Sequence, residues 1–140
     1  MLFSFKDKIE EVEQYLEELT TFLPDDFEVY EHNVEKKAAC ERYFEKIVES
    51  LVDISFLVLK EEGGRIPEED TQAFDLLSKK EIILEALSTR LKEAKGMRNI
   101  LAHEYGIVDD RIVFESITSE LVEDTKTFLN AIKKYLRGKK

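Results

Sequence analysis

Apolar residues in the first 23 positions recur alternately every third and every fourth residue, a spacing that places one apolar stripe along an α-helix. They are Leu2, Phe5, Ile9, Val12, Leu16, Leu19 and Leu23. Pro24 and the two aspartates after it predict the end of this helix, and the stretch up to His32 is expected to be a loop. The stripe predicts packing within a helical bundle or across a dimer seam. A coiled-coil arm is the alternative, although about three heptads are short for one.

A second apolar pattern predicts a long helix from Asn33, a residue type that caps helices, to Lys60. Gly63 and Gly64 follow it, and glycine readily adopts the left-handed turn that ends a helix. Apolar residues point in nearly all directions around this helix, so we expect it to be the central and most buried one. They include Ile47, Val48, Leu51, Val52, Ile54 and residues 56–59.

Three further helices are expected in the second half of the chain. A proline followed by three acidic residues predicts a short helix over residues 67–77. A Ser-x-x-Glu capping box at residues 78–81 predicts the start of a fourth helix that continues toward Arg98. A final helix is expected over residues 110–136. The sequence therefore predicts an all-α, single-domain bundle of about five helices over residues 1–140, with an up-and-down core.

The composition is that of a folded globular protein, with 43% hydrophobic and 37% charged residues. No apolar run approaches the ~20 residues that a transmembrane helix needs, and the first residues lack the pattern of a secretion signal. A single cysteine, Cys40, allows no intramolecular disulfide and suits a reducing compartment. The sequence therefore predicts a cytoplasmic protein.

The net charge of −10 argues against a general nucleic-acid coat protein, which would be basic. The charge is unevenly distributed along the chain, however. Residues 1–31 carry ten acids and two lysines, whereas residues 125–140 carry six basic residues and no acid. Residues 79–98 carry six basic residues and three acids. A local positive face on an acidic body is one interpretation of this pattern, and solvated helix faces are the other.

Most sequence motifs of known catalytic sites are missing. The chain has no glycine-rich phosphate loop, no cysteine–histidine metal spacing and no nucleophile elbow. A four-helix dimetal site needs Glu-x-x-His pairs, and neither His32 nor His103 has a glutamate three residues before it. The sequence therefore predicts neither a metal nor a cofactor. His32, in an acidic stretch, is interpreted as a surface histidine.

His103 has neighbours that suit phosphate chemistry. It lies one helical turn after Asn99, with Arg98 and Tyr105 nearby in the chain. An imidazole titrates near neutral pH and can move the proton of a ribose 2′-hydroxyl. A guanidinium stays charged and can hold a phosphate through two hydrogen bonds. Asn99 can orient the imidazole, and Tyr105 can donate to a phosphate or stack on a base.

These groups suffice for metal-free RNA cleavage, in which the 2′-hydroxyl attacks the adjacent phosphate. The alternative is that Arg98 and His103 only cap the end of a helix. At ~100° per residue, Arg98 and Tyr105 share one face of a regular helix. Asn99 and His103 lie together about 100–140° further round. A bend near Gly106, the long reach of the arginine or a second subunit would therefore have to complete the site.

The segment over residues 98–109 resembles the HepT-like toxin family of the HEPN superfamily. The pattern of that family is an arginine, a polar residue, a short apolar run, His-x-Tyr and an aspartate shortly after. The chain matches this pattern, and the likeness extends over most of its length. The matching residues are Arg98, Asn99, His103, Tyr105 and Asp109.

The resemblance implies a homodimer in which the Arg98 and His103 segments of two chains face one another across a cleft. It implies a metal-independent endoribonuclease toxin with Arg98 and His103 as catalytic residues and Asn99 and Tyr105 in supporting roles. It also implies a minimal nucleotidyltransferase as the antitoxin, able to attach AMP to Tyr105. Two alternatives stay open: a non-catalytic helical subunit that dimerises and supports a nucleotidyltransferase, and a nucleotide-binding module that uses the same arginine and histidine.

Overall fold

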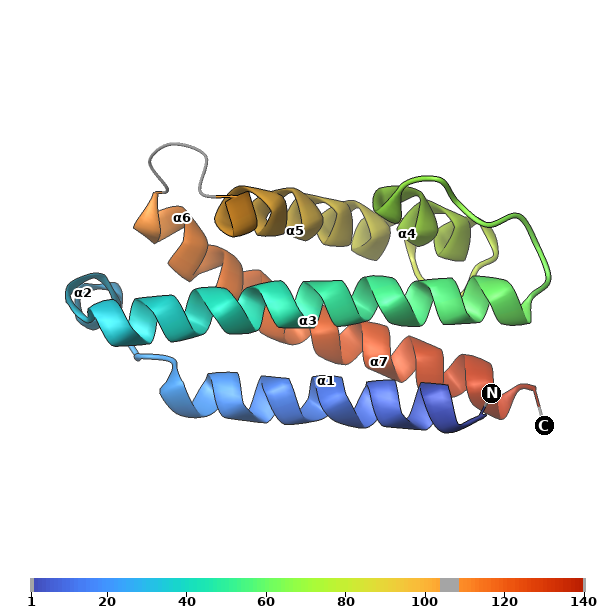
Figure 1. Ribbon diagram of the computed structural model, residues 1–140, viewed down its shortest axis with the longest axis horizontal. Coiled ribbons are helices and arrows are strands. Elements are labelled where there is room, and N and C mark those ends of the chain that lie inside the picture. The colour runs from blue at the N-terminus through green and yellow to red at the C-terminus, as the bar shows by residue number, and fades with distance from the viewer. Residues whose placement is uncertain (1, 104–108, 140) are drawn as a thin grey trace.

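The computed structural model describes residues 2–103 and 109–139, and helices make up its architecture. The elements are α1 (Leu2–Phe22), α2 (Phe27–His32), α3 (Val34–Glu61), α4 (Asp70–Lys79), α5 (Glu85–His103), α6 (Asp110–Glu115), the π-helical η1 (Ser116–Leu121) and α7 (Val122–Arg137). Long helical runs point alternately in opposite directions: α1, α3, α5 and the joined α6, η1 and α7 (Figure 1). This confirms the predicted up-and-down helical bundle. No helix in the described ranges is long and apolar enough to cross a membrane.

Helix α3 lies at the centre of the bundle and contacts α1, α2, α4, α5 and α7 (Figure 1). Because other helices pack on several sides of α3, its apolar side chains are distributed around the helix and not confined to one stripe. This confirms that α3 is the central helix. Its largest fully buried side chains are Phe44, Ile47, Leu51, Ile54 and Leu59. Burial of apolar surface contributes about 25 cal/mol per Å². Helix α3 is therefore the main source of hydrophobic stabilisation.

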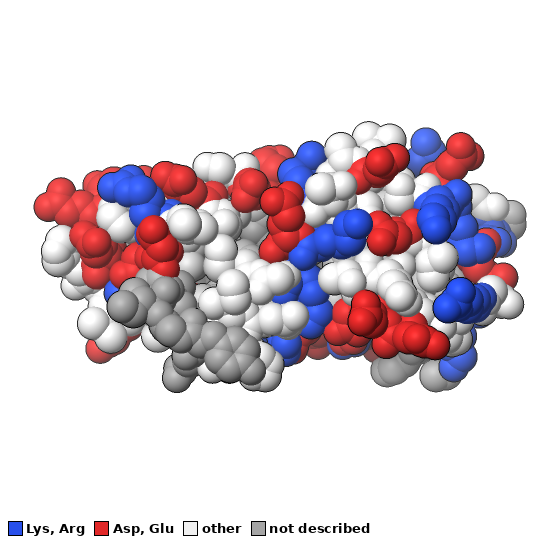
Figure 2. All heavy atoms as spheres, turned by 90° about the horizontal axis from the view of Figure 1, so that it is seen from above, with Lys and Arg blue, Asp and Glu red and all other residues white. Residues whose placement is uncertain are grey.

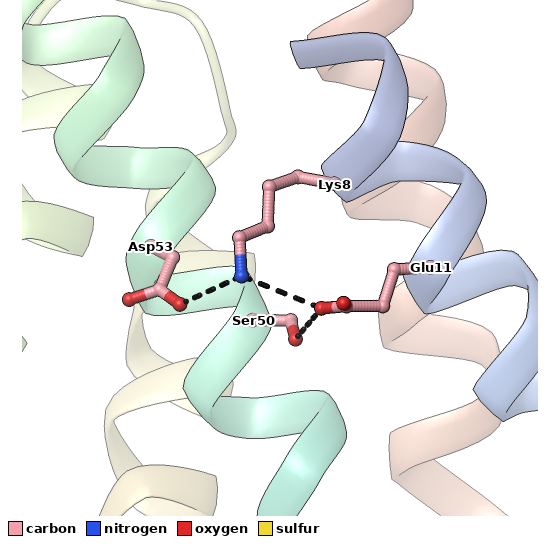
Figure 3. Close-up of polar contacts among 4 residues, drawn as sticks. All are labelled: Lys8, Glu11, Ser50 and Asp53. Atoms are coloured by element: carbon pink, nitrogen blue, oxygen red, sulfur yellow. Dashed lines mark hydrogen bonds and ion pairs between the residues drawn. The ribbon is translucent and has the colours of Figure 1, made fainter. Parts of the chain in front are cut away.

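The stripe of α1 packs within the bundle against α3, which is one of the two predicted arrangements. Its buried members include Phe5, Ile9, Val12, Leu16 and Leu19. Polar side chains border this contact (Figure 3). The ammonium of Lys8 lies 3.4 Å from a carboxylate oxygen of Glu11 in the same helix and 3.2 Å from Asp53 of α3. The hydroxyl of Ser50 donates to the same Glu11 oxygen at 3.2 Å. These contacts favour one register of α1 along α3.

The ends of α3 follow the predicted local chemistry. The side chain of Asn33 accepts a hydrogen bond from the backbone N–H of Lys36 at 2.9 Å, which caps the start of the helix. Gly63, just past its end, has a φ of 71°, the left-handed conformation that glycine adopts without steric cost.

The stretch before α3 differs from the prediction, because a six-residue helix, α2, stands where a loop was expected. Asp26 caps it by accepting from the backbone N–H of Val29 at 2.9 Å. A helix of this length is too short to show a periodic apolar pattern. The short helix predicted over residues 67–77 is present as α4 and begins three residues later, at Asp70.

The capping box predicted at residues 78–81 is wrong. Ser78 belongs to α4, and α5 begins only at Glu85. Glu81 has a φ of 61°, outside the right-handed helical region, and its backbone N–H donates to the carbonyl of Ser78 at 2.9 Å. The same residues therefore close a turn after α4. Ile83, expected on the helix, is buried in this turn.

The last predicted helix is confirmed as the run of α6, η1 and α7. Asp109 caps its start by accepting from the backbone N–H groups of Arg111 at 2.9 Å and Ile112 at 3.3 Å. Asp110 pairs with Lys37 at 2.8 Å, which ties α6 to the start of α3. Helix α1 begins and α7 ends at the same end of the bundle, opposite the C-terminal end of α5 (Figure 1).

Candidate active site

Helix α5 carries the motif residues toward its C-terminal end. It continues as a regular α-helix through Arg98 and Asn99 to His103, while Tyr105 and Gly106 lie outside the described residues. A step of five residues turns a regular helix by about 140°. Arg98 and His103 therefore leave α5 on different sides, as the sequence predicts.

Arg98 contacts a neighbouring helix and its own neighbour in the chain. It forms an ion pair with Glu49 of α3, and its Nη1 donates to Oδ1 of Asn99 at 3.2 Å. Only 20% of its side chain is exposed, and its Nε is buried with no hydrogen-bond partner among the described residues. The guanidinium is therefore held in a defined orientation by Glu49 and Asn99.

The oxygen of Asn99 joins two cationic groups, Arg98 and Lys95. The ammonium of Lys95 donates to Oδ1 of Asn99 at 3.0 Å and lies 3.2 Å from a carboxylate oxygen of Asp70 in α4. Lys95 is 8% exposed, which is unusual for a charged residue. Lys95 lies outside the motif and was not predicted as a site residue. Its burial could have been inferred from its position four residues after Leu91, on the buried face of the helix.

His103 is the last residue of α5, and its side chain is exposed. Asn99 precedes it by four residues, so the two lie on the same side of the helix. Ala102 is exposed, and Ile100 is 44% exposed. This part of α5 is therefore accessible to a substrate or to a second chain.

A groove of about 490 Å³ runs beside this part of α5, between it and α6 with η1. Its lining has apolar side chains from two helices: Ala94, Met97 and Ile100 from α5 and Ile112 from α6. Gly96 also borders the groove, and a Cβ there would meet nothing within 4 Å. Figure 2 shows the bundle from above the view of Figure 1, with an uncharged area beside a group of lysine and arginine side chains that acidic side chains border.

Other reactive groups lie away from α5. Cys40 is buried in α3, and this burial raises the pKa of its thiol to about 11, so it stays protonated at neutral pH. His32 is exposed on α2, with its Nδ1 3.0 Å from the carbonyl oxygen of Glu28, which confirms it as a surface histidine. Within residues 2–103 and 109–139, no group of three or more His, Cys, Asp or Glu side chains is arranged to hold a metal ion. The end of α5 is therefore the candidate site.

The bundle has the fold of a known class of toxins. A solved structure of a tri-AMPylated HEPN toxin from Shewanella oneidensis, in complex with an MNT antitoxin, superimposes on the chain with a TM-score of 0.86. The two share 22% sequence identity, and the match covers 93% of this chain and 96% of the toxin. The arrangement of helices is therefore that of a HEPN bundle.

Sequence comparison identifies the family of the chain. The model of a family described as Ribonuclease HepT-like matches residues 12–132, and the chain belongs to this family. A putative RNase from Archaeoglobus fulgidus is 39% identical over 82 residues, which span 59% of this chain and 58% of that relative. A tRNA nuclease HepT from Aphanizomenon flos-aquae is 26% identical over 129 residues, 92% of this chain and 87% of that relative. The family that the motif indicated is confirmed.

Proposed function

We propose that the chain is a metal-independent endoribonuclease toxin of a toxin–antitoxin pair. The observation that carries the proposal is the end of α5, which combines a firmly held guanidinium at Arg98 with an exposed imidazole at His103. Membership of a family described as Ribonuclease HepT-like supports the same activity. The test is cleavage of single-stranded or transfer RNA by the purified protein in the presence of EDTA.

In the proposed reaction His103 accepts the proton of a ribose 2′-hydroxyl, and the 2′-oxygen attacks the adjacent phosphorus. The bond from phosphorus to the 5′-oxygen breaks, and the proton that His103 accepted passes to that leaving oxygen, which regenerates the base. The products are a 2′,3′-cyclic phosphate and a 5′-hydroxyl. Arg98 neutralises the charge that builds on the phosphate oxygens in the transition state.

A second copy of the chain would complete this site, because Arg98 and His103 leave one helix on different sides. The surface beside them suits such a contact: Ile100 is 44% and Ile112 is 52% exposed, and Gly96 leaves open space for another backbone. Association of two copies about a two-fold axis would bring both motifs to one cleft. A homodimer is therefore part of the proposal.

Ile100→Asp is expected to give a monomer at micromolar concentration in light scattering and to reduce RNA cleavage. A carboxylate in an apolar seam loses its hydration without gaining a partner. Ile66→Asp is the matched control, because Ile66 is 57% exposed and lies between α3 and α4, at the other end of the bundle (Figure 1). A monomeric wild-type protein with full cleavage would contradict the dimer.

A nucleotidyltransferase that transfers AMP to Tyr105 is the partner that we propose as antitoxin. The Shewanella toxin of the same fold is tri-AMPylated and bound to an MNT antitoxin, which supports this pairing. The phenol oxygen would attack the α-phosphate of ATP, and pyrophosphate would leave. Tyr105 lies two positions after His103. The added phosphate would therefore compete with substrate RNA for Arg98.

Co-expression with a minimal nucleotidyltransferase is expected to add one or more AMP masses and to abolish cleavage. Tyr105→Phe is expected to prevent the modification and to leave the helical content unchanged, as measured by intact-mass spectrometry and circular dichroism. Addition of the same AMP mass to the Tyr105→Phe protein would assign the acceptor to another residue.

A further inference from the structure

Two cationic side chains share one oxygen atom at the candidate site. Lys95 and Arg98 offer only hydrogen-bond donors, so the atom of Asn99 between them must be its carbonyl oxygen. The planar amide then directs its nitrogen away from both cations. Asn99 is exposed and precedes His103 by four residues, so the two residues lie on the same side of α5.

A second ion pair, more exposed than that of Lys95, also links α4 and α5. An ion pair between Lys92 and Asp75, with a separation of 2.9 Å, already joins these helices with both side chains more than a third exposed. A buried ammonium loses hydration that only partners can replace. Lys92 and Lys95 each pair with an aspartate of α4, but Lys95 also donates a hydrogen bond to Asn99. This additional bond indicates a role for Lys95 at the candidate site.

We propose that Lys95 is a positioning residue of the candidate active site, an inference that rests on the proposed ribonuclease function. Lys95, paired with Asp70, holds the Asn99 oxygen in place beside Arg98. The Asn99 NH₂ group then donates to a phosphate oxygen of RNA bound at His103.

One terminal nitrogen of the Arg98 guanidinium donates to Asn99, and the other pairs with Glu49 of α3. Side chains of α3, α4 and α5 thus set the orientation of two groups that face the substrate, Arg98 and Asn99. Lys95 itself stays buried and does not touch RNA.

A double-mutant cycle on Lys95 and Asn99 tests this role. Lys95→Met keeps an unbranched side chain of similar volume, one atom shorter, and removes its donor. We expect it to lower kcat about 10- to 100-fold, since small misplacements of reacting groups have effects of this size. Asn99→Ala is expected to lower kcat at least as much. The double variant should equal Asn99→Ala alone, because Lys95 acts through Asn99. KM should change little, whereas loss of a lysine that binds RNA directly would raise it.

Lys92→Met is the matched control, because it removes an ion pair between the same two helices and leaves Asn99 untouched. Its kcat is expected to stay within about twofold of wild type, since surface ion pairs contribute little. Asp70→Asn serves as a second probe if Lys95→Met fails to fold, and a smaller loss of kcat is expected for it. Additive losses in the double variant, or an equal loss in Lys92→Met, would overturn the role of Lys95 while wild-type cleavage stands. Wild-type protein without cleavage would overturn the proposed function itself.

Discussion

His103→Ala is expected to lower the rate of RNA cleavage by ~10²- to 10⁴-fold in the presence of EDTA, the range that general acid–base groups contribute. The side chain is exposed at the last residue of α5, so its removal leaves the core intact. The measurement is single-turnover cleavage of end-labelled RNA. Analysis of the product ends should identify 2′,3′-cyclic phosphates.

His32→Ala is the control for this variant, because it removes the chain's other histidine from an exposed position on α2. We expect it to cleave at the wild-type rate. Cleavage by His103→Ala at the wild-type rate would point to a contaminating nuclease and would remove His103 from the mechanism. A wild-type chain that dimerises and binds a nucleotidyltransferase but cuts no RNA would be a non-catalytic subunit.

Arg98→Ala is expected to lower kcat by ~10²- to 10³-fold, as loss of one donor to a developing oxyanion does. Arg98→Lys should recover only part of this loss. An ammonium keeps the charge but lacks the planar, two-pronged geometry that can bind a phosphate while contacting Glu49 and Asn99. Steady-state kinetics on a short RNA would separate the effect on kcat from that on KM.

Arg137→Ala is the matched control for this series. Arg137 is an exposed arginine at the end of α7, at the opposite end of the bundle from the end of α5 (Figure 1). The variant changes the net charge by the same amount, so its cleavage is expected to match wild type at moderate ionic strength. An equal loss in Arg98→Ala and Arg137→Ala would mean that overall charge, and not a specific phosphate contact, governs cleavage.

The long helices could be predicted because their apolar positions repeat over many turns, as in α1, or fill most of the helix surface, as in α3. Short signals were less informative. The Ser-x-x-Glu spacing at residues 78–81 fits a helix start and a turn equally well. The position of Ser78 inside α4 and the left-handed backbone of Glu81 show that it forms a turn. The six-residue α2 depends on one cap, Asp26, and has no periodic pattern.

The part of the candidate site that lies on α5 could be predicted from the sequence. Arg98, Asn99 and His103 are close in the sequence, so their residue types could be recognised together. The partners Glu49 and Asp70 come from two other helices, and among 31 acidic residues nothing in the sequence distinguishes these two. Their roles depend on tertiary packing, which brings α3 and α4 against α5.

Helix α1 begins and α7 ends at the same end of the bundle, which determines where the protein can be tagged or immobilised. Because this end lies opposite the C-terminal end of α5, an affinity tag or fluorophore added near either terminus is remote from the motif (Figure 1). A chain tethered to a sensor surface through such a tag would present the last turn of α5 to the flowing solution. Immobilisation is therefore compatible with measuring RNA or antitoxin binding at that turn.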